Sequence, residues 1–140
     1  MQFTSNELYM LLNLRPATQT TDGALWLPYA DLSEANLRWA ILPHADLRCA
    51  NLHGAKLSGA NLSQADLSDA TLAGASLIRA DLRGANFTRA DLANADLREA
   101  NLRDAVLVGA NLSNAKVIDR QLRGAKSLQG ATLPDGTVHD

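Results

Sequence analysis

The stretch that decides the fold is residues 60–84, which read ANLSQ ADLSD ATLAG ASLIR ADLRG. Alanine returns at every fifth position, and leucine follows each alanine by two places. The same five-residue unit runs from Ala30 to Gly124 and occurs nineteen times without a gap. Alanine opens the first eighteen units, and the third place departs from leucine only at Phe87 and Val117.

This period excludes the two simplest structures. Alanine and leucine favour a helix, but five residues advance a helix by about 140°, so the leucines would spiral around it and form no apolar face. In a flat strand an odd period would send successive leucines to opposite sides. A turn in every unit removes both conflicts. We therefore expect a coiling solenoid that directs alanine and leucine inward and buries a core no single unit could bury.

The tandem A(D/N)LXX units closely resemble the pentapeptide-repeat proteins. The resemblance covers about 95 of the 140 residues. It implies an all-β fold, a right-handed, four-sided parallel β-helix with four pentapeptides in each coil. At about 4.8 Å between coils, the repeat region of just under five coils would form a rod roughly 23 Å long.

Both ends of such a rod need covers, because a solenoid exposes apolar layers there. Residues 1–29 predict an N-terminal capping helix and loop. The helix begins after Thr4, whose segment to Glu7 matches a capping box, and Pro16 ends it. Residues 125–140 predict a closing segment without helical pattern. Either this tail folds back over the last coil or a second subunit covers it.

The composition and charge of the chain exclude several classes of protein. The chain carries a net charge of -2, which is far from the strongly basic profile of nucleic-acid-binding proteins. No apolar run reaches the length of a membrane span, and no secretory signal is visible. A single cysteine, Cys49, excludes an intrachain disulfide. These features predict a cytoplasmic protein that binds neither nucleic acid directly nor membrane.

Catalytic and cofactor motifs are absent from the sequence, so we expect no enzyme, no cofactor and no metal. His44, Cys49 and His53 lie within ten residues of each other. On a four-sided coil they would fall on three successive sides and diverge. The abundant Asp residues share the second place of the unit with Asn, which favours a role in hydrogen bonding or solubility over catalysis.

The candidate partner surface consists of two groups of outward residues. Arg83, Arg103 and Arg123 are 20 residues apart and would stack on one side, where they could bind phosphate or an acidic partner. The alternative is a solvated face on which neighbouring carboxylates pair with them. Val106 and Val108 would share one side near the C-terminal end, where they would either contribute to a dimer or partner contact or be ordinary exposed apolar surface.

The resemblance implies a non-catalytic scaffold or protein-interaction module of bacterial, cyanobacterial-like type, whose protein partner the sequence does not identify. Some family members instead mimic duplex DNA and bind DNA gyrase or topoisomerase, and others regulate turnover or cell differentiation. The near-neutral charge and short rod disfavour the DNA-mimic alternative. Family members also dimerise through their C-terminal coils, so a homodimer through that end is a further expectation.

Overall fold

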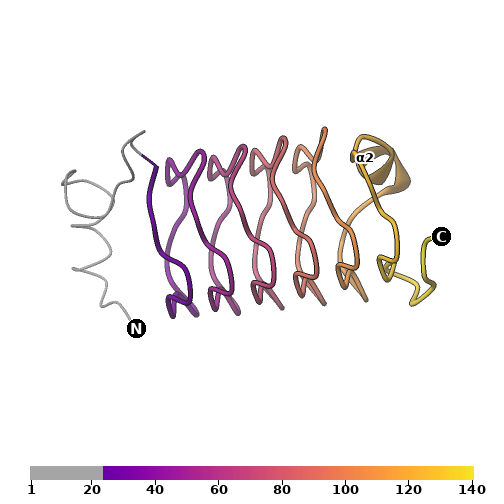
Figure 1. Ribbon diagram of the computed structural model, residues 1–140, viewed down its shortest axis with the longest axis horizontal. Helices are drawn as coiled ribbons and strands as arrows, with labels where there is room; N and C mark the ends of the chain where they lie inside the picture. Colours follow the sequence, from indigo (N-terminus) through magenta and orange to yellow (C-terminus); the bar gives the residue numbers. More distant parts are fainter. Residues whose placement is uncertain (1–23) are drawn as a thin grey trace.

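A computed structural model describes residues 24–140. The predicted N-terminal helix lies outside the described residues. Within them, the chain forms a stack of similar coils along the long axis of the molecule (Figure 1). The β-structure consists of single-residue bridges, without longer named strands in this part of the chain, and the one helix described is α2, Asp119–Arg123.

Parallel bridges join residues that are 20 apart, and they set the size of one coil. On one side Trp26 pairs with Asp46, Asp46 with Asp66, and Asp66 with Asn86. Three further series begin at Asp31, Asn36 and Ile41, so each coil holds four pentapeptides. We number the four sides in chain order. The bridging residues of face 1 are 26, 46, 66, 86, 106 and 127, and those of face 2 are 31, 51, 71, 91, 111 and 132. Face 3 contains 36, 56, 76, 96 and 116, and face 4 contains 41, 61, 81 and 101.

Every corner of the coil is a tight turn between pentapeptides. The Ala65 N–H donates to the Leu62 carbonyl at 3.0 Å, and the fifth residue of that unit, Gln64, has a φ of 59°. A positive φ at the third of four turn residues is the mark of a type II turn. Glycine, asparagine and aspartate adopt this conformation most easily, which explains why they recur at the fifth place of the unit.

Alanine and leucine fill the interior as the repeat predicts. Leu52 through Leu97, with Phe87 among them, have no exposed surface at the third place of each unit, and the corner alanines of these coils are equally covered. Among residues 24–140 every buried side chain is apolar. The core is therefore one continuous column, and polar groups are left to the outside.

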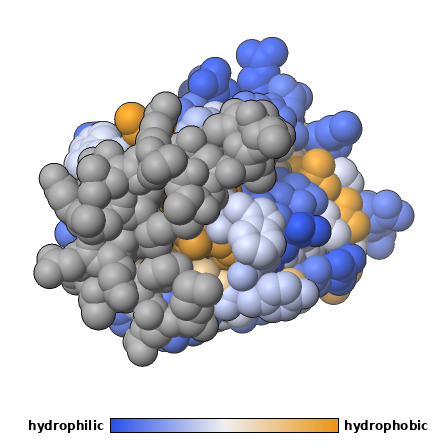
Figure 2. Space-filling model, turned by 60° about the vertical axis from the view of Figure 1, so that its left-hand side comes forward, coloured by the Kyte–Doolittle hydropathy of each residue, from blue (hydrophilic) through white to orange (hydrophobic). Residues whose placement is uncertain are grey.

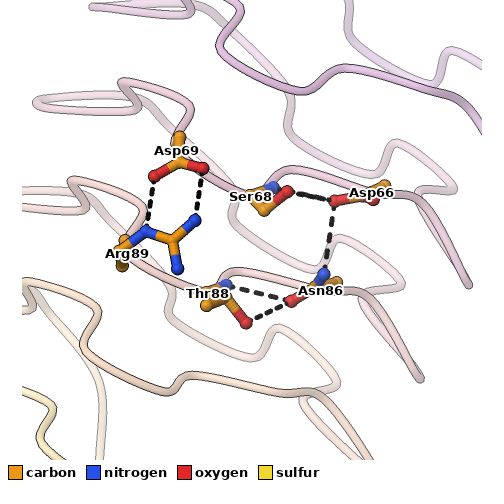
Figure 3. A network of polar contacts seen from close by, with 6 residues as sticks. All are labelled: Asp66, Ser68, Asp69, Asn86, Thr88 and Arg89. Carbon is orange, nitrogen blue, oxygen red and sulfur yellow. Dashed lines mark hydrogen bonds and ion pairs between the residues drawn. The ribbon is translucent and has the colours of Figure 1, made fainter.

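Outside this column, the second residue of each unit organises the polar side chains (Figure 3). Asp66 Oδ1 accepts hydrogen bonds from the backbone N–H and the hydroxyl of Ser68, at 3.0 and 2.7 Å. Asn86, one coil further on, donates its Nδ2 to the same oxygen at 3.3 Å and accepts from the Thr88 hydroxyl at 2.6 Å. The hydrogen-bonding role predicted for these Asp and Asn residues is confirmed here.

The nineteenth unit, Arg120–Gly124, was predicted to be a further pentapeptide, and this is wrong. Most of it belongs to α2, which occupies the end of face 4 and points Leu122 into the core with 7% of its surface exposed. The helix adds one residue to the coil. Ser127 consequently pairs with Val106 and Thr132 with Asn111, each across 21 positions instead of 20.

This one-residue shift explains the tail. In the sequence the pentapeptide register slips after Gly124, because Ser127 stands where leucine is expected. With the shift, Leu128 and Leu133 return to third places and pack partly buried against the core. Val138 then pairs antiparallel with Thr132, so the chain folds back at its end. Of the two covers considered for this end, the folded-back tail is therefore present.

Replacement of a central leucine by alanine should lower the stability of the folded protein. Leu72→Ala leaves a cavity in a core without exposed surface, and we expect the free energy of unfolding to fall by roughly 2–5 kcal/mol. Urea denaturation followed by circular dichroism measures the change. The exposed neighbour Thr71→Ala serves as control and should shift stability by less than about 0.5 kcal/mol. Equal losses in the two variants would contradict a close-packed core.

Candidate interaction surfaces

Recognition by this protein has to occur on its outward side chains, because the interior of residues 24–140 is filled by apolar groups. The repeat fixes the first and third places of each unit. The second, fourth and fifth places face outward and differ from coil to coil. The candidate partner residues all belong to these variable places or to α2.

The three arginines of the predicted column have different surroundings in the structure. Arg83 is held by Asp81, with Nε 2.8 Å from Oδ1 and Nη2 2.6 Å from Oδ2. Arg103 makes only a 3.6 Å contact with Asp104. The Asp104 N–H donates to the carbonyl of Gly124 at 2.8 Å, so the residue stacked beneath Arg103 is Gly124 and the prediction that Arg123 continues the column is wrong. The extra residue of α2 causes this shift.

The pairing of Arg83 with Asp81 is one case of a local motif, which the prediction of stacking between residues 20 apart did not include. In Asp-Leu-Arg units the aspartate and arginine are two residues apart and point outward on the same side of an extended segment. Two contacts of 2.6 to 2.9 Å therefore join Asp46 to Arg48, and the same pattern recurs in Asp96-Leu97-Arg98. The i, i+2 spacing in the sequence is the signal that could have revealed it.

Ion pairs also run between coils. Arg79 Nε lies 2.8 Å from Oε2 of Glu99, the residue 20 positions further along the chain. Arg89 contacts both oxygens of Asp69 at 2.7 Å (Figure 3). Hydrogen bonds from these guanidinium groups hold the pKa values of Glu99 and Asp69 below their ordinary values. Since both pairs are largely exposed, each contributes little to stability.

Val106 and Val108 lie on face 1, one coil before the tail. Both are half-buried, and Val106 bridges Asn86 on one side and Ser127 on the other. The structure thus brings the two valines together on one side, next to the last coil. It does not bring them to the arginines of face 4.

Large exposed hydrophobic residues, three of them aromatic, form a feature of the first described coil that the candidate surface did not include. Trp26, Tyr29, Trp39 and Ile41 are each more than half exposed. The indole ring of Trp39 lies over Gly59 of the next coil, where a Cβ would overlap it. Figure 2 turns this end of the molecule forward and shows apolar side chains at the surface between hydrophilic ones.

The histidines and the cysteine lie on different sides of the rod. His44 is in the face 4 series, Cys49 in face 1 and His53 in face 2, as their neighbouring bridges at residues 41, 46 and 51 show. Among the described residues, no group of three His, Cys, Asp or Glu is arranged to hold a metal ion. A helix long and apolar enough to cross a membrane is also absent from residues 24–140.

A family model of pentapeptide repeats matches overlapping stretches of the chain, residues 30–69, 50–89, 65–104 and 85–119. These stretches cover more than half of the chain, which therefore belongs to the pentapeptide-repeat proteins. Proteins of this family form right-handed β-helices, and the 20-residue register of the described coils agrees with that architecture.

Solved structures of the family resemble this chain along most of its length. The pentapeptide repeat protein alr5209 from Nostoc Pcc 7120 is 31% identical, with 89% of this chain and 95% of that chain covered and a TM-score of 0.68. A pentapeptide repeat protein from Cyanothece 51142 is 28% identical over 97% of this chain and 99% of its own, with a TM-score of 0.49. QnrB1, described as a plasmid-mediated fluoroquinolone resistance protein, is 25% identical over 76% and 61%, with a TM-score of 0.43. No curated protein matches the chain.

The Asp96–Arg98 pair should make stability depend on acid pH. Hydrogen bonds from Arg98, together with the nearby charge of Lys116, lower the pKa of Asp96. A lowered folded-state pKa stabilises the protein above the unfolded pKa of about 3.9, and this contribution is lost as pH falls through the folded value. Asp96→Asn keeps an oxygen for the Arg98 N–H but removes the charge. We expect a loss of roughly 0.2–1 kcal/mol at pH 7.

Urea unfolding of wild type and Asp96→Asn at pH 7 and near pH 2 measures this difference. The difference between the two proteins should shrink as the pH falls, because protonation of Asp96 removes the charge that Asn lacks. In an Arg98→Gln background the same substitution should have a smaller effect at pH 7. A stability difference of equal size at both pH values would contradict the ion pair as its cause.

Proposed function

We propose that this protein is a non-catalytic interaction or scaffold module that presents fixed arrays of outward side chains to a protein partner. The observation that supports this most is the filled interior, in which every buried residue of 24–140 is apolar. The coil ladder holds the variable second, fourth and fifth places at regular spacing. Membership of the pentapeptide-repeat proteins is compatible with such a role. We place it in the bacterial cytoplasm, in keeping with a chain that holds a single cysteine.

The alternative function, mimicry of duplex DNA toward gyrase or topoisomerase, needs a strongly negative rod. The net charge of this chain is -2. Several carboxylates are also neutralised by bound arginines, including Asp46, Asp81 and Asp96 at 2.6 Å each. These ion pairs weaken the field that a DNA-binding groove would recognise, so the interaction module is the better-supported function.

The interaction function predicts a specific protein partner. Tagged full-length protein should capture that partner from a lysate of its source organism, and the two purified proteins should then form a complex measurable by calorimetry. The Nostoc pentapeptide repeat protein serves as a control, because it shares the family at only 31% sequence identity. Failure of every captured candidate to bind as a purified protein would contradict the proposal. Inhibition of gyrase supercoiling at micromolar protein would favour the DNA mimic instead.

We also propose a homodimer through the C-terminal end. Val117, Leu128 and Leu133 are only partly buried there, whereas the leucines of the middle coils have no exposed surface. A second copy placed end to end would cover these residues. Val106 and Val108 stand beside this end on face 1 and would lie at the rim of the contact.

Sedimentation velocity tests the dimer. Wild type should sediment at about twice the 15.0 kDa of one chain, and Val106→Asp with Val108→Asp should shift it toward the monomer. The reason is that two carboxylates at the rim would repel across the two-fold contact. Ile78→Asp, in the middle of face 3, is the control and should leave the dimer intact. A wild type that sediments as a single chain would rule the dimer out.

A further inference from the structure

Positive charge is concentrated around α2. Residues 103–126 contain five cationic and two acidic side chains, a local net charge of +3 (5 - 2) in a chain whose total is -2. Arg120 and Arg123 are three apart in α2, so they share one side of the helix. Arg103 lies directly above Gly124, the residue after Arg123. We call Arg103, Ile118, Arg120 and Arg123 the α2 surface.

The cations of the α2 surface differ from those of the preceding coils in how they are held. Five of the six arginines within residues 24–102 make close ion pairs of 2.6 to 2.8 Å, and the exception is Arg38 in the first described coil; the five are Arg48, Arg79, Arg83, Arg89 and Arg98. Arg103 is 78% exposed and contacts Asp104 only at 3.6 Å. Across the described part of the chain, no carboxylate lies within ion-pair distance of Arg120 or Arg123. These guanidinium groups are therefore available to an external anion.

The backbone that carries them is fixed. Leu122 is buried in the end of the core. Gln121 donates its Nε2 to the carbonyls of Leu97 and Ala100 at 2.6 and 2.9 Å, and its Oε1 accepts from the Ile118 N–H at 3.0 Å. Arg120 and Arg123 thus flank two anchored residues. Little backbone freedom would be lost when a partner binds.

We propose that the α2 surface binds an acidic face of a partner protein. Two observations favour a protein over a nucleic acid. Asp104 and Asp119 are interleaved with the arginines and would repel a uniform row of phosphates, whereas a protein surface can place its own cations opposite them. Ile118 is 62% exposed at the start of α2 and offers an apolar contact beside the charges. The inference rests on the proposed interaction function and names the chemistry of the partner.

Fluorescence anisotropy at low salt tests the inference with defined probes. These are a labelled peptide of Asp, Glu and Leu, the same peptide with Asn and Gln in place of the acids, and a short DNA duplex. The first variant is Arg103→Ser with Arg120→Ser and Arg123→Ser. The matched control is Arg79→Ser with Arg83→Ser and Arg98→Ser, which removes the same charge from closely paired positions. Circular dichroism and urea unfolding verify that both variants are folded.

We expect wild type to bind the acidic peptide more tightly than the neutral one. The α2 variant should lose about tenfold in affinity, or about 1.4 kcal/mol, and the control variant about twofold or less. Equal losses in the two variants would overturn the proposal, because net charge alone would then explain binding. Tighter binding of the DNA duplex, or no binding of the acidic peptide, would also overturn it.

The outcome is separable from that of the proposed function. A purified partner that binds wild type and the α2 variant with the same affinity would refute the α2 surface as its site and leave the interaction function standing. Failure to find any partner would contradict the interaction function, while the peptide measurement would still report on the α2 surface.

Discussion

The hydrogen-bond ladder between residues twenty apart is the constraint on which the whole structure depends. In each coil the N–H and C=O groups at the second place both bond to the preceding coil: the Asn86 N–H donates to Ala65 at 2.9 Å and the Asn86 carbonyl accepts from Leu67 at 2.8 Å. Because the ladder recurs on all four sides, the leucines of successive coils must stack. The size of the core, the spacing of outward side chains and the position of each corner then follow from one register.

The register also determines which charges neutralise each other. Side chains at the same place of adjacent coils are stacked, so Arg79 meets Glu99 and Arg89 meets Asp69. Side chains two residues apart in one unit face the same way, so Asp81 meets Arg83. Cations that follow these rules are paired in the middle of the rod. The arginines at α2 and Arg103 beside it stand outside both rules, as does Arg38 in the first described coil.

The resemblance to the family supplied the four units in each coil, and the period of five was enough to predict a coiling chain with an inner column of alanine and leucine, because both depend on local spacing and repetition. It was not enough to predict α2. Arg120–Gly124 keeps leucine at its third place and fits the template, while the helix is held by Gln121 bonding to carbonyls more than 20 residues earlier. Such a contact has no local signal. The candidate arginine column failed for the same reason, since it assumed that the register continued past Val117.

The four-sided register fixes the angle between the α2 surface and the outward residues of the first described coil. Each pentapeptide carries the chain along one of four sides, so five residues inserted before α2 would rotate the α2 surface by a quarter turn relative to the aromatic residues of the first coil. Twenty inserted residues would lengthen the rod and restore the original orientation. Relatives that differ by whole coils can therefore keep the relative direction of two binding surfaces, whereas those that differ by single units must change it.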